Sequence, residues 1–216
     1  MADPATGIPA PAARLHFELV KWEAGRDMHR FHRVAHGQSD FNASGLGDAR
    51  FSPIRTATGK LIPTLYGGSS FECAAMETVF HDVPFAGGFK SFDKNKLTDW
   101  RASVLRPARE LNLIDLSSKS LRKLGITRNQ LIDSETINYP QTRLWAVALH
   151  AQCPQADGLQ WVSRQDDQAT AVVLFGDRLS SAELKPIQPP VDIVSDPGCY
   201  AQVLALAQRI GVLILA

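Results

Sequence analysis

Residues 47–82 read GDARFSPIRTATGKLIPTLYGGSSFECAAMETVFHD and carry the clearest local pattern of the chain. They predict two short strands, a tight turn between them, and a helix that follows a Gly-Gly pair. A serine before the helix can accept a hydrogen bond from the free backbone N–H groups of its first turn. The expected boundaries are strands at 49–52 and 61–66, Gly67-Gly68 ending the second strand, and a helix over about 71–81 capped by Ser69 or Ser70.

Strands and helices follow one another along the rest of the chain without a regular alternation. This mixture favours an α+β fold, a single domain in which strands from distant parts of the chain meet in one mixed sheet with flanking helices. Residues 82–110 show few periodic signals. We expect strands at 29–34, 111–116, 159–163 and 170–175, and helices at 118–126, 141–152 and 199–210.

The composition is that of an ordinary globular protein. With 216 residues, 44% hydrophobic and 21% charged, the chain suits one compact domain. A net charge of +1 gives no reason to expect direct binding to nucleic acid. Three scattered cysteines indicate reduced thiols, and no stretch has the length of a membrane span, so we expect a cytoplasmic protein without a membrane segment. Residues 1–14 predict a flexible tail before a domain at 15–216.

Glu77 is the most informative acidic residue. On a helix its neighbours three and four positions away include Ala74 and Phe80, so the carboxylate would lie beside an apolar stripe. Such a carboxylate needs a cationic or hydrogen-bonding partner. It is either a catalytic group in a cleft or the structural partner of an arginine, and the helix alone leaves both interpretations open.

Four further residues are candidates for a binding site. Arg33 and Arg50 can each bind a phosphate or carboxylate with two parallel hydrogen bonds, although either can equally be a surface residue or the partner of Glu77. Tyr66 precedes the Gly-Gly pair, where a ligand could approach the backbone closely. Trp161 can form a pocket wall or simply belong to the core. Ser163 shares the strand face of Trp161 by period-two alternation.

A metal site is not expected. His29, His32 and His36 lie close together in the sequence, but the segment alternates like a strand and offers no acidic third ligand. Walker loops, dinucleotide-binding glycine motifs and nucleophile elbows do not occur either.

Together the motifs resemble the RES domain, a family named for its Arg, Glu and Ser. The resemblance covers about residues 28–178, and the phrase from RFSP to METVFHD is its most specific part. The matching positions are Arg33 in HRFHRV, Arg50 in GDARFSP, Tyr66 in PTLYGG, Glu77 in CAAMETVFHD and Ser163 in LQWVSR.

The resemblance implies an ADP-ribosyltransferase-like fold and a toxin of a bacterial toxin–antitoxin pair, whose partner is an Xre-type antitoxin. The implied activity is cleavage of the nicotinamide–ribose bond of NAD⁺ by hydrolysis or phosphorolysis, with NAD⁺ as substrate and no cofactor. Glu77 would act on the ribose, Arg33 and Arg50 on the diphosphate, Tyr66 near the nicotinamide ribose, and Ser163 on a ribose hydroxyl or an arginine. ADP-ribosyl transfer to a host protein, and an inactive module that only binds an antitoxin or nucleotide, remain the alternatives.

Overall fold

The computed structural model describes residues 7–88 and 90–215. In this part of the chain, nine strands form one sheet, in which β8 and β9 run parallel and the other recorded neighbours run antiparallel. In spatial order they are β1 (Leu19–Trp22), β8 (Leu111–Asp115), β9 (Gly158–Val162), β10 (Thr170–Phe175), β5 (Thr64–Gly68), β2 (Met28–Arg33), β7 (Trp100–Pro107) and β11 (Leu184–Pro186), with β12 (Val191–Asp192) also on β7.

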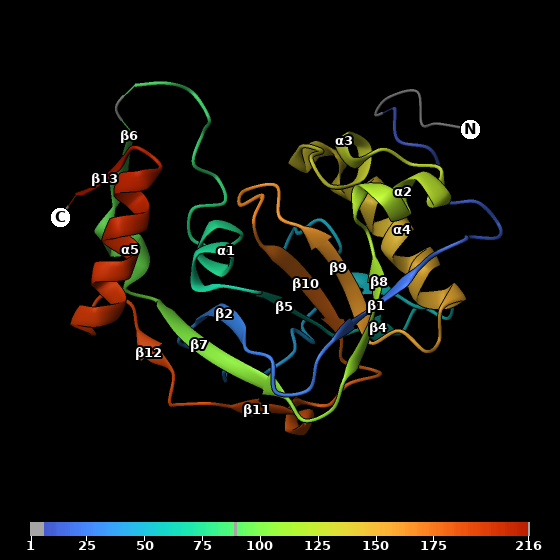
Figure 1. The fold of residues 1–216 in the computed structure, drawn as a ribbon, viewed down its shortest axis with the longest axis horizontal. Coiled ribbons are helices and arrows are strands. Elements are labelled where there is room, and N and C mark those ends of the chain that lie inside the picture. Colours follow the sequence, from blue (N-terminus) through green and yellow to red (C-terminus); the bar gives the residue numbers. More distant parts are fainter. Residues whose placement is uncertain (1–6, 89, 216) are drawn as a thin grey trace.

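Two small sheets and five α-helices complete the fold of the described residues. The helices form separate groups: α2, α3 and α4 lie together beside β8 and β9, α5 lies at the other end of the molecule beside β6 and β13, and α1 lies between them (Figure 1). The small sheets are β3 (Ile54–Arg55) with β4 (Leu61–Ile62), and β6 (Lys90–Asp93) parallel to β13 (Val212–Leu215). The helices are α1 (Phe71–Met76), α2 (Ser118–Leu124), α3 (Arg128–Leu131), α4 (Tyr139–Gln152) and α5 (Pro197–Arg209), with 3₁₀ turns η1 (Lys94–Leu97), η2 (Thr136–Asn138) and η3 (Ser181–Glu183).

The α+β class and the mixed sheet are confirmed. The strands expected at 159–163 and 170–175 pair antiparallel as β9 and β10, and the segment after Pro140 continues as α4. Helix α2 ends at Gly125, whose φ of 77° is the left-handed conformation that glycine adopts without strain. Buried apolar side chains pack on both faces of the sheet, so α2, α4 and α5 each cover part of a core.

The segment around Arg50 is a turn rather than a strand. Ala49 and Ser52 exchange backbone hydrogen bonds with each other, and the N–H of Phe51 donates to the hydroxyl of Tyr66 at 3.1 Å. The backbone groups of this segment bond to each other and to the Tyr66 side chain. The segment therefore has no neighbouring strand with which to form a β-ladder. The strand expected at 49–52 is therefore wrong, and β3 begins at Ile54.

Helix α1 is capped by Ser70, one of the two serines expected to cap it. The helix ends at Met76, however, and not at about residue 81. Glu77 is its C-cap, and the next three backbone N–H groups all donate to the single carbonyl of Ala75. Because one carbonyl receives all three, the helical ladder cannot continue and the chain turns. Glu77 therefore lies at the end of a short helix.

The glycine pair forms the last two residues of β5, Gly67 and Gly68, and is paired within the sheet. A Cβ on Gly67 would lie 2.7 Å from the Cγ of Met28, and one on Gly68 would lie 2.9 Å from the Sγ of Cys73. The missing side chains allow β2 and α1 to pack against β5. The glycines thus serve close packing within the protein.

The expected flexible tail also needs correction. Residues 1–6 lie outside the described residues, but the residues that follow them are fixed on α4. Ile8 is buried, and the indole Nε1 of Trp145 donates to the carbonyl of Pro9 at 2.8 Å. One buried side chain and hydrogen bonds to α4 hold this segment in place.

Candidate active site

A cavity of about 440 Å³ opens where β2 and β5 separate. In the described structure these two strands pair at His29 and Gly68, and beyond that point β2 pairs with β7 while β5 pairs with β10. Side chains of β2 line one wall and side chains of β5 line the other. The turn at Arg50 and the segment after α1 close the remaining sides, so five predicted residues line one space: Arg33, Arg50, Tyr66, Glu77 and Trp161.

Glu77 is held by Ser163. The Ser163 hydroxyl donates to Oε1 of Glu77 at 2.6 Å, and it accepts backbone N–H groups of Gln165 and Asp166 at 3.0 and 3.1 Å. Because the two backbone N–H groups occupy the lone pairs of the hydroxyl oxygen, the hydroxyl hydrogen is left to donate to the carboxylate. Ser163 is 0% exposed, so it holds Glu77 from the interior of the protein. The second carboxylate oxygen accepts no hydrogen bond from the described residues.

Arg50 is anchored at one end and free at the other. Its Nη1 donates to the carbonyl and the hydroxyl of Ser134 at 3.1 and 3.0 Å, and the guanidinium lies 5.1 Å from the centre of the Tyr139 ring. Burial lowers the pKa of Arg50, and the nearby Tyr139 and Glu77 offset only part of that lowering. Among the described residues none accepts a hydrogen bond from Nε or Nη2. These donors are available for an anion in the cavity.

Tyr66 is a neutral phenol in this site. Burial raises its pKa to about 12, and its hydroxyl accepts the N–H of Phe51 at 3.1 Å. It cannot act as a general base near neutral pH, because almost none of it is ionised there. Its ring meets Trp161 edge to face, with ring centres 6.3 Å apart. Trp161 is 2% exposed and packs against Phe51 as well, so it forms a rigid back wall.

Arg33 occupies the rim. Its side chain is 48% exposed, pairs with Asp99 at 3.2 Å and stacks on Trp100 with 4.1 Å between the guanidinium carbon and the ring centre. An ion pair this exposed contributes little to stability and can rearrange around a ligand. Arg33 is therefore placed to meet the outer part of a bound molecule.

Most of the other lining residues are absent from the sequence-based predictions, and Arg30, His81 and Tyr139 are among them. The Tyr139 hydroxyl lies 3.3 Å from Nε2 of His81, and its ring supports Arg50. Tyr139 comes from α4, far along the chain, and nothing in its local pattern distinguishes it from a core residue. The sequence held one indication that His81 belongs to the site, because His81 lies four positions after Glu77.

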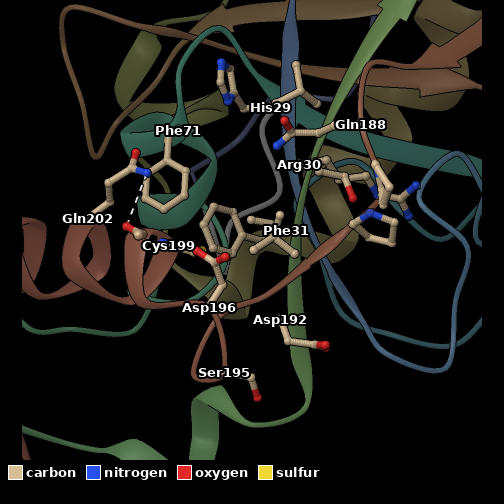
Figure 2. Close-up of a pocket in the computed structure, with 17 residues that line it drawn as sticks. His29, Arg30, Phe31, Phe71, Gln188, Asp192, Ser195, Asp196, Cys199 and Gln202 are labelled. Atoms are coloured by element: carbon tan, nitrogen blue, oxygen red, sulfur yellow. Dashed lines mark hydrogen bonds between the residues drawn. The ribbon is translucent and has the colours of Figure 1, made fainter.

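A second, larger cleft of about 710 Å³ lies between α1, α5 and the segment before β12 (Figure 2). Phe31 and Phe71 meet there edge to face, with ring centres 5.0 Å apart. Its carboxylates are already engaged: Asp192 pairs with Arg101 at 2.7 Å, and Asp196 caps α5. The cleft contains neither Glu77 nor Arg50, so the cavity between β2 and β5 is the better candidate for chemistry.

The described residues contain no group of three or more His, Cys, Asp or Glu that could hold a metal ion. None of their helices is long and apolar enough to cross a membrane. The three cysteines are buried and unpaired, and burial raises the pKa of Cys73 to about 12, so its thiol is not a nucleophile at neutral pH.

The family model of the RES domain matches residues 25–196. The chain belongs to the RES domain family. The resemblance seen in the sequence motifs is thereby confirmed. The RES fold of this chain is also similar to a chain in the crystal structure of the M. tuberculosis MbcT–MbcA toxin–antitoxin complex, with a TM-score of 0.61 at 15% identity over 87% of this chain and 92% of that chain. At this identity the likeness establishes a shared fold. No curated protein matches the chain.

Proposed function

We propose that this RES domain protein is the toxin of a bacterial toxin–antitoxin pair and breaks the bond between nicotinamide and ribose in NAD⁺. The observation that carries the proposal is the Glu77 carboxylate, fixed by Ser163 and turned into a cavity that also holds the free donors of Arg50. Membership of the RES family and a fold shared with a chain of a toxin–antitoxin complex support the biological role.

The chemistry requires a carboxylate at the ribose. When the C1′–N bond breaks, its electron pair leaves with nicotinamide, which departs as a neutral molecule, and positive charge develops on the ribose as in glycoside hydrolysis. The Glu77 carboxylate would stabilise that charge or hold the attacking oxygen nucleophile near C1′. The nucleophile forms the new C1′–O bond and releases a proton. Ser163 would act through Glu77 as a positioning residue.

The remaining side chains would hold the substrate. Arg50 would bind the diphosphate through Nε and Nη2, and Arg33 would contact the same group from the rim. Neutral Tyr66 and the buried ring of Trp161 would shape the wall beside the nicotinamide ribose. A cavity of about 440 Å³ falls within the range of roughly 300–1,000 Å³ that is common for small-molecule sites.

The partner in this proposal is an Xre-type antitoxin, and the compartment is the cytoplasm. The toxin itself needs no contact with nucleic acid, because DNA binding belongs to the antitoxin in such pairs. An antitoxin that covers the cavity mouth would block NAD⁺ entry. This proposal includes no resident cofactor.

One experiment identifies the acceptor. Purified protein is incubated with NAD⁺ alone, with NAD⁺ and inorganic phosphate, and with NAD⁺ and cell extract, and free nicotinamide and labelled protein are measured. Nicotinamide release without labelled protein supports hydrolysis, or phosphorolysis if phosphate accelerates it. Labelled protein in the extract indicates ADP-ribosyl transfer instead. Intact NAD⁺ that is nevertheless bound would mean that the domain only binds nucleotide.

A further inference from the structure

Helix α5 and strand β13 form one end of the molecule together with β6 (Figure 1). The match to the RES family model ends at residue 196, so both α5 and β13 follow the part of the chain that the model covers. Strand β13 pairs with β6 on one side, and no other strand within residues 7–88 and 90–215 pairs with it. Its second edge, called the open edge below, therefore presents backbone N–H and C=O groups to no neighbouring strand.

The segment that contains α5 and β13 is almost free of charge. Residues 197–215 contain one charged residue, Arg209, whose guanidinium is paired with Glu72 at 2.6 Å. A surface helix normally turns charged side chains toward water, as α2 does with the exposed Arg122 and Lys123. The exposed face of α5 carries no such unpaired charge, which is typical of a surface that contacts another protein.

Large apolar side chains occupy this uncharged surface. Leu204 on α5 is 41% exposed, and Leu213 and Leu215 on β13 are 50% and 44% exposed. Val212 and Ile214 pack against the core, so alternate residues of β13 face the interior and the solvent. A groove of about 470 Å³ opens between α5 and β13 beside Leu204, and none of its lining residues is charged.

The two strands of this small sheet differ in how their edges are protected. Proteins normally protect an exposed strand with charged side chains, prolines or bulges. Strand β6 carries Lys90 and Asp93, whereas β13 has the sequence Val-Leu-Ile-Leu, with neither charge nor proline. A sheet of two strands is marginally stable, and more strands with an apolar face are needed for a stable unit. The open edge of β13 is therefore suited to receive a further strand.

We propose that the open edge of β13 pairs antiparallel with β13 of a second copy of this chain, so that the two small sheets join into one sheet of four strands. A twofold contact requires a surface that is complementary to itself. Two identical uncharged strands meet this requirement, because their contact buries apolar side chains and leaves no charge without a partner. A charged partner would find no opposite charge on this strand.

The alternation of β13 also fixes which residues meet. Residues directly opposite each other in an antiparallel pair lie on the same face of the sheet. With the twofold axis at Ile214, Leu213 of one copy lies opposite Leu215 of the second copy, and both leucines lie on the face that is exposed in the single chain. The groove beside Leu204 is lined by Leu213 and Ile214 as well, which places Leu204 within the same contact.

The first test measures the molecular mass of the full chain by light scattering over a wide range of protein concentrations. We expect wild type to reach twice the mass of one chain. Leu213→Lys should raise the dissociation constant of the dimer at least about tenfold, since a lysine at an apolar contact costs more than about 1.4 kcal/mol. Leu144→Lys is the control, because Leu144 is a 55% exposed leucine on α4, outside this surface.

Three results of the mass measurement would overturn the inference. Wild type that is a monomer at every concentration would assign this surface to another partner, such as an antitoxin segment or a membrane. A dimer that Leu213→Lys leaves unchanged, or that Leu144→Lys weakens equally, would place the interface elsewhere. If Leu213→Lys does not fold, as its melting temperature would show, Leu204→Lys on α5 takes its place with the same expected loss, and an unchanged dimer then overturns the inference.

The second test examines the strand pairing itself. Leu213→Cys and Leu215→Cys proteins are oxidised separately and as a mixture, and covalent dimers are counted on a denaturing gel. Only the mixture should give substantial dimer, because the Cα atoms of a disulfide lie within about 7 Å and only residues 213 and 215 lie opposite each other. The native cysteines are buried and present in every sample. Absence of dimer in the mixture, or as much dimer in either variant alone, would overturn the proposed pairing. Neither test uses NAD⁺, so both are independent of the proposed function.

Discussion

Ser163 and Glu77 illustrate how a candidate residue can be visible in the sequence while its contacts are not. The alternation of β9 places Ser163 near the site, but only the fold shows that its hydroxyl is occupied by two backbone donors and by Glu77. The two residues are 86 positions apart in the chain. No local pattern could have shown that the serine hydroxyl donates to this carboxylate.

Ser163→Ala should therefore lower kcat for NAD⁺ cleavage about tenfold and leave KM nearly unchanged. The Glu77 carboxylate would lose the donor that fixes it, and a carboxylate free to rotate stabilises the transition state less well. Ser195→Ala, an exposed serine on the loop before α5, is the matched control. A rise in KM with normal kcat would show that Ser163 contacts the substrate in place of positioning Glu77.

Arg50→Ala should weaken substrate binding and turnover while the protein stays folded. The lost charge-assisted contact is worth roughly 1.5–3 kcal/mol, which is about a tenfold to hundredfold loss in kcat/KM. Arg50→Lys should recover only part of it, since an ammonium group cannot use two donors in one plane. Steady-state kinetics on both variants tests this, and full activity in Arg50→Ala would remove Arg50 from the site.

At the scale of elements, the sequence predicts those whose signal is local. A proline at the start of α4, a glycine at the end of α2, alternating apolar residues in β8 and β9 and a continuous apolar run in β10 were sufficient to place them. Strands β6 and β7 lie in the segment without periodic signals, and β13 is four residues long. Their partners are distant: β13 pairs with β6 across more than 100 residues, so local propensity gave no sign of them.

Gly158 is the residue on which the β9–β10 pairing depends most directly. A Cβ at this position would lie 2.2 Å from the backbone carbonyl oxygen of Val173, and a backbone atom cannot move aside as a side chain can. Gly158→Ala should separate β9, which carries Trp161 and leads to Ser163, from β10, and lower the melting temperature by about 10 °C or more, at roughly 2–4 °C per kcal/mol. Gly87→Ala, where a Cβ would meet nothing within 4 Å, should melt like wild type. Equal melting of the two variants would contradict this account of the sheet.

At the scale of the whole molecule, the cavity arises from a separation of strands that no single segment encodes. Tyr66 and Arg33 come from β5 and β2, Arg50 from a turn, and Glu77 from the end of α1. The motifs identify four of these residues by resemblance. Arg30 and Tyr139 could not be found in this way, because their significance comes from the cavities they line and from the side chains they face.

Buried histidines make the stability of the molecule depend on pH. Burial lowers the pKa of His29, His32 and His150 below the ordinary value of 6.5, so the unfolded chain takes up protons at a higher pH than the folded protein does. The contribution of these histidines to the free energy of unfolding is complete above about pH 6.5 and declines as the pH falls below that value. The melting temperature should therefore drop between pH 7.5 and pH 5.5.

His32→Gln should reduce that drop, because it removes a buried imidazole whose Nε2 lies 2.8 Å from the hydroxyl of Ser103. His16→Gln changes an exposed histidine and should leave the slope of melting temperature against pH as in wild type. Identical slopes in wild type and His32→Gln would show that His32 does not contribute to the acid sensitivity.

The central claim is that Glu77 performs the chemistry, and nicotinamide release by Glu77→Gln tests it most directly. Glutamine keeps the shape and removes the charge, so NAD⁺ binding through the arginines should persist while turnover falls by about 10²–10³ or more. The melting temperature, measured on the same sample, should stay close to that of wild type. A stable Glu77→Gln protein that releases nicotinamide at a nearly wild-type rate would contradict the account and leave Glu77 as a structural residue.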